Sequence, residues 1–353
     1  FGPDYIEASD MPNLRRMMRS GHFKVGKGVI PSVTNVNNAS LITSSFPAEH
    51  GITTNFFFDE KTGEAKEMES GEYLLRPTLL EKAKARGWKT ALATTKDKVR
   101  TLCSRGADIA VSAEKPAAEW MAKVGPKENM YSAPVNYWTM RAARALLRDG
   151  VDLLYLSTTD YMMHTYAPKE APSLEHLHTM DKLVADLAND HPKLEFYLTA
   201  DHGMNAKREA IDPARVLAGK GIAAEAVPII RDKHKVHHGN LGGACYVYLK
   251  NKADRAKAAD LLKAVPGIEE IYDNRTAARE FRLHPDRIGD LFLLAAKDVA
   301  FGELESVREA AKVRTHGSRY EAQVPLVVYG RKVEFGKYEY NLDLSRFLDL
   351  ERV

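Results

Sequence analysis

The chain has 353 residues, of which 44% are hydrophobic, and its formal net charge is +3. This length fits one large α/β core that carries an insertion, and the hydrophobic fraction excludes general disorder. The small net charge argues against a nucleic-acid-binding surface.

Cysteine content and hydropathy bound the cellular setting. The two cysteines are Cys103 and Cys245, and buried free thiols are favoured over a disulfide. The sequence has no apolar run of about 18 residues and no signal-peptide pattern. We therefore expect a cytoplasmic protein without a membrane segment. The chain opens at Phe1 rather than at a methionine, so a natural start or leader outside the printed sequence is left open.

The first predicted helices flank a candidate anion-binding turn. Residues 10–20 have a helical pattern, with Asp10 as the expected N-cap and Pro12 in the first turn. A second helical pattern begins near Thr34, after an apolar, proline-broken run. The unpaired amides and positive dipole end of a helix N-terminus favour an anion such as phosphate. The alternative is that Thr34 or Asn35 merely caps this helix.

Two lysines follow the next predicted strand. Residues 78–86 predict a helix, residues 89–93 predict a strand, and Lys96 and Lys98 come shortly after it. On an extended loop, side chains two residues apart share one side, where two ammonium groups could clamp a carboxylate or a phosphate. A solvated surface pair is the alternative.

Asp160 and His164 follow a further predicted strand. Residues 134–148 predict a helix that stops at Gly150, and residues 151–157 predict a core strand. The spacing of four residues places Asp160 and His164 on one face of a helical turn, where they could bind one metal ion. By itself this spacing is typical of an ordinary surface pair.

The pentapeptide T-A-D-H-G at residues 199–203 follows a predicted helix at residues 174–187 and a short buried strand at residues 194–198. Open α/β sheets bind ligands at the carboxyl ends of their strands. Asp201 offers an oxygen and His202 a nitrogen, a set that suits zinc or ferrous iron. Adjacent strand residues point to opposite faces, so both reach one ion only where the strand turns, which Gly203 permits. A simple polar turn is the alternative.

From about residue 206 the pattern changes to that of an α+β insertion. It predicts a helix at residues 253–264 and strands at residues 225–230, 244–249 and 268–272. His237 and His238 within it are interpreted as loop or rim residues, with contact to the substrate as the alternative. Core-like strands return at residues 291–295 and, after His316, at residues 324–330. We expect a core of residues 1–205 and 286–353, with an inserted α+β cap domain at residues 206–285.

In chain order, the candidate residues are Thr34, Asp160 with His164, Asp201 with His202, and His316. This set resembles the alkaline phosphatase superfamily of two-metal phosphoryl-transfer enzymes, and within it the nucleotide pyrophosphatase/phosphodiesterase branch, whose nucleophile is threonine. Four segments further resemble the phosphonoacetate hydrolases of that branch: P-S-V-T-N-V-N-N at 31–38, P-A-E-H-G-I at 47–52, K-D-K at 96–98 and H-G-S at 316–318. The resemblance covers nearly the whole chain. It implies a doubly wound, mainly parallel sheet with helices on both faces.

The resemblance also implies roles for these residues. Two divalent metal ions are implied, with zinc favoured and iron or manganese as alternatives. Asp160, His164 and His316 would hold one ion, Asp201 and His202 the other, and Thr34 would lie between them as the nucleophile. Asn55 would support a phosphonate oxygen, and Lys96 and Lys98 would face the substrate carboxylate.

One further ligand of the family pattern is expected outside the printed sequence. The family supplies an additional metal-binding aspartate in a D-G-x-x-P-x-Y pattern, and residues 1–5 match only its last five positions. The Asp-Gly and its strand would lie just before residue 1. Asp4 is a poor substitute because it lies beyond the proline.

The implied reaction is hydrolysis of the carbon–phosphorus bond of phosphonoacetate to acetate and phosphate through a phosphothreonine intermediate, with a role in phosphonate catabolism. A phosphodiesterase or nucleotide pyrophosphatase on the same site is the alternative; Tyr131, Tyr161 or residues 56–58 could then hold a base. A non-catalytic, metal-dependent phosphonate-binding module is a third interpretation. The expected partner is a small phosphonate, with neither nucleic acid nor membrane, and a homodimer is left open.

Overall fold

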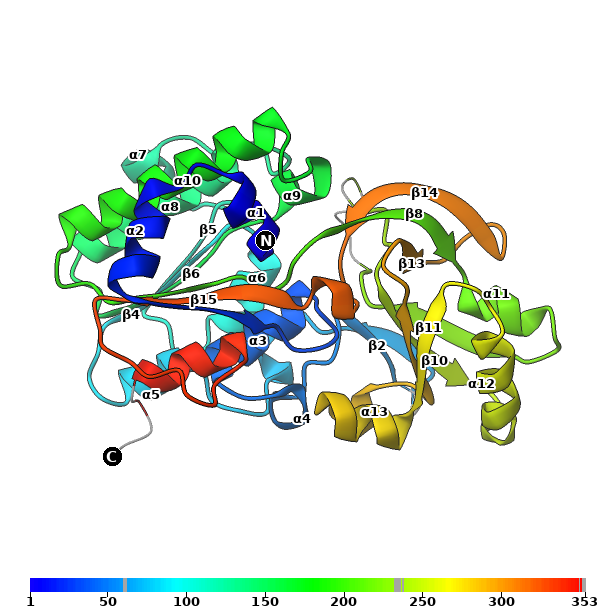
Figure 1. Cartoon of the computed structure of the whole chain (residues 1–353). Helices are drawn as coiled ribbons and strands as arrows, with labels where there is room; N and C mark the ends of the chain where they lie inside the picture. Colours follow the sequence, from blue (N-terminus) through cyan, green and yellow to red (C-terminus); the bar gives the residue numbers. More distant parts are fainter. Residues whose placement is uncertain (60–61, 232–235, 237, 349, 351–353) are drawn as a thin grey trace.

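A computed structural model describes residues 1–59, 62–231, 236, 238–348 and 350. Figure 1 shows two groups of strands: β4, β5, β6 and β15 lie among helices on the left, and β10, β11 and β13 lie on the right. Strands β8 (Asn205–Ile211) and β14 (Arg308–Thr315) run from the centre of the molecule to the right-hand group. This pair therefore connects the two groups.

The left-hand group contains two three-stranded sheets. In one, β4 (Thr90–Thr94) lies between β5 (Ile109–Ser112) and β6 (Leu153–Ser157) and is parallel to both. In the other, β15 (Gln323–Tyr329) lies between β1 (His22–Lys27) and β7 (Phe196–Thr199) and is antiparallel to both. The expected mainly parallel sheet is thus correct only for β5-β4-β6. The chain leaves this sheet at the carboxyl end of β7 and returns to it at the same end to begin β15. Strand β15 therefore runs in the direction opposite to β7.

Strands β6 and β7 face a common cavity. Its volume is about 660 Å³, and its lining includes Leu154, Leu156 and Leu198. In the described part of the chain, the strand pairings do not join the sheet of β6 to the sheet of β7.

Helices lie on both sides of the left-hand strands: Figure 1 shows α2, α8 and α10 above them and α3 and α5 below. Helix α8 (Pro134–Arg148) has its predicted bounds, with proline in its first turn and Gly150 at φ 79° just beyond its end. Thr78 and Glu81 form a capping box at α5 (Leu79–Lys84). Helix α2 (Pro12–Ser20) has Met11 rather than Asp10 as its N-cap, so that prediction is wrong. The other helices on this side are α1 (Pro3–Ala8), α3 (Thr34–Thr43), α4 (Pro47–His50), α6 (Asp97–Cys103), α7 (Ala118–Val124), α9 (Tyr161–Thr165) and α10 (Ala171–Asp190).

The right-hand group is built on an antiparallel sheet in the order β11-β12-β10-β9. Its strands are β9 (Ala224–Pro228), β10 (Ala244–Leu249), β11 (Ile268–Asp273) and β12 (Leu291–Ala295), and its helices are α11 (Pro213–Ala218), α12 (Arg255–Lys263) and α13 (Asn274–Phe281). A short hairpin of β2 (Phe56–Asp59) and β3 (Glu64–Glu67) lies nearby, and β13 (Val299–Phe301) pairs with β8.

One strand is in a different sheet from the one predicted. Leu291–Ala295, expected to return to the core, pairs as β12 with β10 and β11. An uninterrupted apolar run fits any strand that is buried on both faces, so its pattern does not identify the sheet. The domain boundary at residue 285 stays a prediction.

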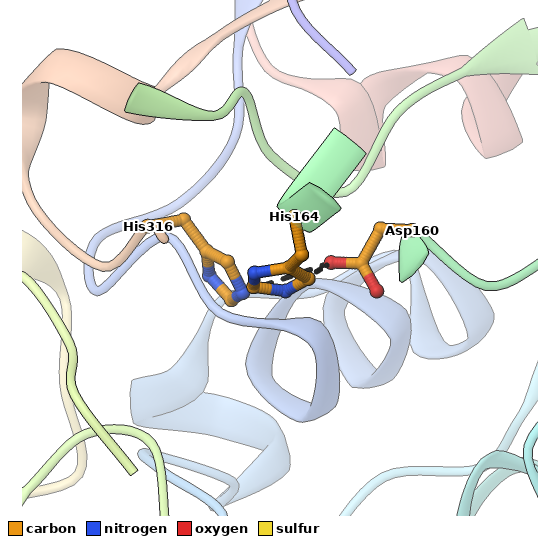
Figure 2. Close-up of side chains that lie close together, drawn as sticks. All are labelled: Asp160, His164 and His316. Atoms are coloured by element: carbon orange, nitrogen blue, oxygen red, sulfur yellow. Dashed lines mark ion pairs between the residues drawn. The ribbon is translucent and has the colours of Figure 1, made fainter. Parts of the chain in front are cut away.

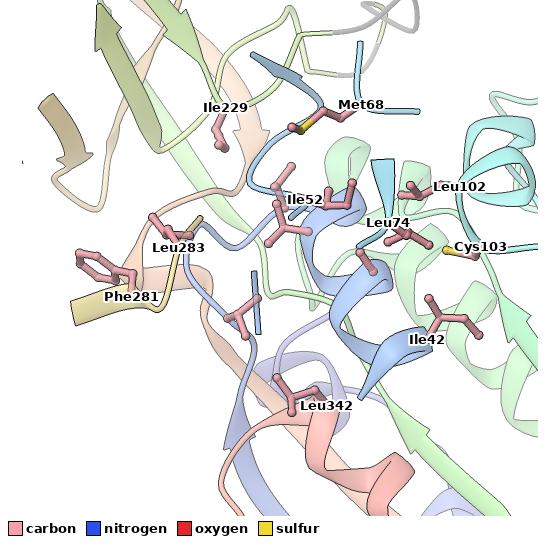
Figure 3. Close-up of a cluster of buried hydrophobic side chains, with 14 of the residues drawn as sticks. Ile42, Ile52, Met68, Leu74, Leu102, Cys103, Ile229, Phe281, Leu283 and Leu342 are labelled. Carbon is pink, nitrogen blue, oxygen red and sulfur yellow. The ribbon is translucent and has the colours of Figure 1, made fainter. Parts of the chain in front are cut away.

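One hydrophobic cluster spans both groups of strands. It includes Ile42 and Ile52 from the left-hand side and Ile229, Phe281 and Leu283 from the right-hand side (Figure 3). Burial of each such side chain stabilises the fold by about 1.5–3 kcal/mol, so the shared core fixes one group against the other.

Two further observations bear on the sequence expectations. Cys103 and Cys245 are buried free thiols, as predicted. No helix in the described ranges combines the length and the apolar composition that a membrane crossing requires.

Candidate metal centre

Asp160, His164 and His316 come together at the end of two elements. Asp160 is the N-cap of α9, His164 lies four residues on in the same helix, and His316 directly follows β14. One ligand atom from each lies within 4.8 Å of the other two, and Figure 2 shows the three side chains pointing toward one another. Nε2 of His164 is 3.1 Å from Oδ2 of Asp160. These are the three residues that the resemblance assigns to one ion.

Asp201 and His202 adjoin this group at the end of β7. Nε2 of His202 lies 3.3 Å from Oδ2 of Asp201 and 3.7 Å from Oδ2 of Asp160. The rings of His202 and His316 are stacked, with centroids 3.4 Å apart. The carboxyl end of β7 and the end of β14 therefore bring both predicted ligand sets to one place.

Thr34 lies at the edge of the same cluster, because its Oγ1 is 3.2 Å from Nε2 of His202. It is the first residue of α3, whose N-cap is Val33 and has no capping side chain. The alternative in which Thr34 or Asn35 caps the helix is therefore wrong. The side chain of Asn37 bonds Val29 N at 2.8 Å and Val29 O at 3.2 Å, so the helix itself fixes the loop that leads into it.

The hydrogen bonds of the three histidines define which ring nitrogen faces the centre. Nδ1 of His164, His202 and His316 lies 2.6, 2.9 and 2.8 Å from a backbone carbonyl oxygen, that of Arg314, Gly203 and Ser32 respectively. A carbonyl only accepts, so each Nδ1 carries the proton and donates it. Each neutral ring then presents its Nε2 lone pair to the centre, which is the arrangement of metal-binding histidines.

Burial favours the neutral form of His202 and His316. It lowers the pKa of His202, and it lowers the pKa of His316 well below its usual value. Burial alone would raise the pKa of Asp160, but the neighbouring Lys96 ammonium outweighs it and holds that pKa well below its usual range. The centre thus combines an ionised carboxylate with neutral imidazoles.

This donor set fits a divalent cation. Oδ2 of Asp160 is buried and accepts no hydrogen bond from any described residue, and the three Nε2 atoms lie 3.1–3.7 Å from it. A carboxylate oxygen and imidazole lone pairs repel one another unless a positive charge lies between them. Aspartate oxygen and histidine nitrogen are common ligands of zinc, so the residues present suit the metal that the sequence implies.

The two lysines differ from their predicted setting. Lys96 is the N-cap of α6 and Lys98 lies in its first turn, because the chain turns into a helix directly after β4 instead of continuing as an extended loop. Lys96 and Lys98 are 8% and 5% exposed, so the surface-pair alternative is wrong. Nζ of Lys96 is 3.1 Å from Oδ1 of Asp160. A buried ammonium group therefore borders the cluster.

The other residues predicted to contact the substrate are Asn55 and a group of aromatic side chains. Asn55 is buried, and its side-chain oxygen accepts no hydrogen bond within the part of the chain that the structure describes. The rings of Tyr131 and Tyr161 pack against each other with centroids 5.8 Å apart. Tyr161 directly follows Asp160 in the sequence. Phe57 and Phe58 pack on Tyr73 and Tyr248 instead. The role of Asn55 and the further aspartate before residue 1 stay predictions.

Sequence reasoning missed Glu321. His238 lies in a turn, in agreement with its interpretation as a loop or rim residue; it is 3% exposed, and its ring centroid is 5.8 Å from that of His164. The alternative of a substrate contact stays a prediction, and His237 lies outside the described residues. Glu321, which bonds Ser318 behind His316, carries no local signal because acidic residues are common everywhere.

Comparison with known proteins agrees with this arrangement. The family model for type I phosphodiesterase / nucleotide pyrophosphatase matches residues 1–319. A venom phosphodiesterase of Naja atra is 24% identical over 224 residues, an alignment that covers 58% of this chain. The same alignment covers 25% of that protein, so the chain spans only about a quarter of the length of this curated relative.

Solved structures extend the comparison to the whole chain. Phosphonoacetate hydrolase from Sinorhizobium meliloti 1021, in complex with phosphonoacetate, is 31% identical with a TM-score of 0.89, and the match covers 98% of this chain and 92% of that one. Murine ectonucleotide pyrophosphatase / phosphodiesterase 5 is 16% identical with a TM-score of 0.72, covering 100% and 93%. At that identity the murine protein supports the fold alone.

Proposed function

Because the chain belongs to the type I phosphodiesterase / nucleotide pyrophosphatase family of the alkaline phosphatase superfamily and is a hydrolase, we propose that it hydrolyses the carbon–phosphorus bond of phosphonoacetate. The observation that carries this proposal is the buried Lys96 amine, 3.1 Å from Asp160 in the cluster that Thr34 adjoins. A nucleophile, a metal-binding set and a cation for a carboxylate thus lie together. The similarity to a hydrolase solved with phosphonoacetate supports the same substrate.

We assign two divalent ions to the cluster, with zinc favoured. Asp160, His164 and His316 would hold one, and Asp201 and His202 the other. When bound, such ions supply positive charge that polarises the phosphonate and lowers the pKa of the Thr34 hydroxyl.

The chain's own residues account for the rest of the reaction. The Thr34 hydroxyl gives its proton to water, its Oγ1 attacks phosphorus in line with the carbon, the new O–P bond forms, and the P–C bond breaks. Its electron pair passes to the carbon beside the carboxylate, giving an enolate-like dianion that Lys96 and Lys98 stabilise where the charge develops. A proton from water converts this dianion to acetate. A second water then hydrolyses the phosphothreonine, releasing phosphate and restoring the Thr34 hydroxyl.

The second candidate is a phosphodiesterase or nucleotide pyrophosphatase using the same threonine. The packed rings of Tyr131 and Tyr161 favour it, because aromatic faces stack on bases. The cytoplasmic location, the homodimer and the role in phosphonate catabolism also remain proposals.

The deciding experiment measures phosphate and acetate release from phosphonoacetate by protein loaded with zinc, manganese or iron, beside hydrolysis of a nitrophenyl nucleotide ester. We expect stoichiometric phosphate and acetate, at a much higher kcat/KM than for the ester. Preferential hydrolysis of the ester would establish the second candidate. Two bound ions with no turnover of either compound would leave the phosphonate-binding module, and the proposed reaction would be wrong.

A further inference from the structure

We propose that Glu321 is a positioning residue that holds the His202 and His316 loops against each other, with Lys207 as its counterion. This inference rests on the metal-binding part of the proposed function and not on the substrate. The described hydrogen bonds of the Glu321 side chain go to Ser318, Asn205 and Lys207 and not to a predicted metal ligand; it acts through the two segments that carry the ligands.

The Glu321 carboxylate bonds both segments. Its Oε2 accepts hydrogen bonds from Ser318 N at 2.9 Å and Ser318 Oγ at 2.7 Å, two residues after His316. Its Oε1 accepts from Asn205 Nδ2 at 2.8 Å and Lys207 Nζ at 2.9 Å, at the start of β8, which follows His202. One side chain therefore links the residues that come after each histidine.

The backbone around Glu321 adds to this link. Gly203 N donates to Glu321 O at 2.6 Å, which fixes the residue next to His202. Ser32 Oγ donates to Ser318 O at 2.7 Å, and Ser32 O in turn receives the Nδ1 hydrogen of His316. Ser32 lies two residues before Thr34, so the same network reaches the loop of the nucleophile.

The pairing of β8 with β14 determines where His202 and His316 lie relative to each other. In the β8–β14 pair, Asn205 is opposite Thr315, so His202 precedes one strand and His316 follows the other at the same end. These two strands run out to the right-hand group (Figure 1). Motion of that pair would move the two histidines relative to each other, and Glu321 closes the end of the pair where they lie.

Both charges of the Lys207–Glu321 pair lie in the protein interior. The side chains of Lys207 and Glu321 are both 0% exposed, and Lys207 Nζ also donates to Lys297 O at 2.8 Å. A buried ion pair is often no more stabilising than apolar residues of similar volume, but it fixes geometry, and losing one partner leaves an uncompensated charge. We therefore assign this pair to the geometry of the metal centre rather than to general stability.

The test is the Glu321→Gln variant, compared with Asp181→Asn as a matched control. A glutamine at 321 has one accepting oxygen, so its NH2 group must face either the Ser318 N–H or the Lys207 ammonium, donor against donor. Asp181 is likewise a buried carboxylate, accepting from Asn13 N at 3.1 Å and Leu14 N at 2.7 Å. It binds α10 to α2, and its described hydrogen bonds go to Asn13 and Leu14 and not to a predicted metal ligand. Both variants lose stability, but only the first should alter the metal centre.

The readout is zinc affinity by competition with a chelating indicator, without substrate, together with the visible spectrum of the Co2+-loaded protein. We expect Glu321→Gln to weaken zinc binding about 10- to 100-fold and to change the cobalt spectrum, and Asp181→Asn to change neither. Equal metal affinity in wild type and Glu321→Gln, or an equal loss in both variants, would overturn the inference.

Ser318→Ala provides the test if Glu321→Gln does not fold, because it keeps the ion pair and removes one hydrogen bond to Oε2. We expect a smaller loss of zinc affinity, about 3-fold to 10-fold, in line with the net contribution of one ordinary hydrogen bond, because the other bonds to Glu321 remain. Wild-type affinity and an unchanged cobalt spectrum in Ser318→Ala would overturn the inference. A wild type that binds zinc but does not hydrolyse phosphonoacetate would refute the proposed substrate and leave these metal-binding results to decide Glu321.

Discussion

The Thr34 hydroxyl oxygen lies 3.2 Å from Nε2 of His202, although 168 residues separate them in the chain. The contact arises because α3 begins at Thr34 and β7 ends just before Asp201, so a helix N-terminus meets the carboxyl end of a strand. Both ends are places where an anion or a metal ion binds. This position supports the proposed role of Thr34 as the nucleophile.

Thr34→Ala should abolish turnover of phosphonoacetate, by at least about 10³-fold in kcat, because the nucleophile is gone and not merely displaced. Bound metal should stay near the wild-type level, since the Asp and His ligands are intact. The measurement is phosphate release alongside metal analysis of the same sample. Thr34→Ser, which keeps a hydroxyl, is the control and should retain part of the activity. Near-normal turnover by Thr34→Ala would remove Thr34 from the mechanism.

Lys96→Ala and Lys98→Ala should each impair phosphonoacetate hydrolysis more than hydrolysis of an aryl phosphate ester. The ester has no carboxylate to bind and expels a good leaving group, so only the phosphonate needs the lysines. The loss in kcat/KM for phosphonoacetate should be about 10- to 100-fold, as for a hydrogen bond to a charged group. Lys115→Ala is the control, because Lys115 pairs with Asp97 and its side chain is 61% exposed. Equal losses on both substrates would argue against a carboxylate clamp.

Much of the fold was predictable because the strongest local patterns agree with the final packing. Helix α8 and strand β10 have the bounds that the sequence predicts, since proline and glycine mark the ends of α8 and the strand is an uninterrupted apolar run. The direction of β15 and the sheet of β12 were not predictable. Both depend on which distant strand supplies the hydrogen-bonding partner, and local pattern contains no such information.

The candidate site followed from the order of its residues along the chain, whereas its surroundings did not. Asp160, His164, Asp201, His202 and His316 all stand at element ends, where sequence reasoning looks for ligands. The setting of Lys96 was misjudged because its helix begins at Asp97, directly after the strand. The contacts of Glu321 span more than 100 residues in sequence, and a spacing rule does not detect contacts of that length.

Removal of metal with a chelator should stop turnover and lower the thermal midpoint of unfolding, while the chain stays folded. Without a metal ion, Oδ2 of Asp160 and the histidine lone pairs face one another, and Lys96 on Oδ1 offsets only part of this repulsion. A ligand at about 1,000 times its Kd stabilises the native state by about 4 kcal/mol, so the shift should be several degrees. Differential scanning calorimetry before and after dialysis against chelator measures it, and zinc should restore both properties. An unchanged midpoint would argue against a bound metal in the native protein.

His50, in the P-A-E-H-G-I segment, should make stability depend on pH without touching the metal centre. Burial, with a contribution from the charge of Arg287, lowers its pKa from 6.5 to about 3; its Nε2 lies 2.8 Å from Ser40 Oγ, and its Nδ1 accepts from Ile52 N. Between these two pKa values the unfolded chain binds a proton that the folded chain does not. The free energy of unfolding therefore falls as pH falls below 6.5, by about 1.4 kcal/mol per pH unit. Urea titrations from pH 7 to pH 5 at fixed zinc should show a steeper fall for wild type than for His50→Gln, and parallel curves would mean that the pKa of His50 is not lowered in the native protein.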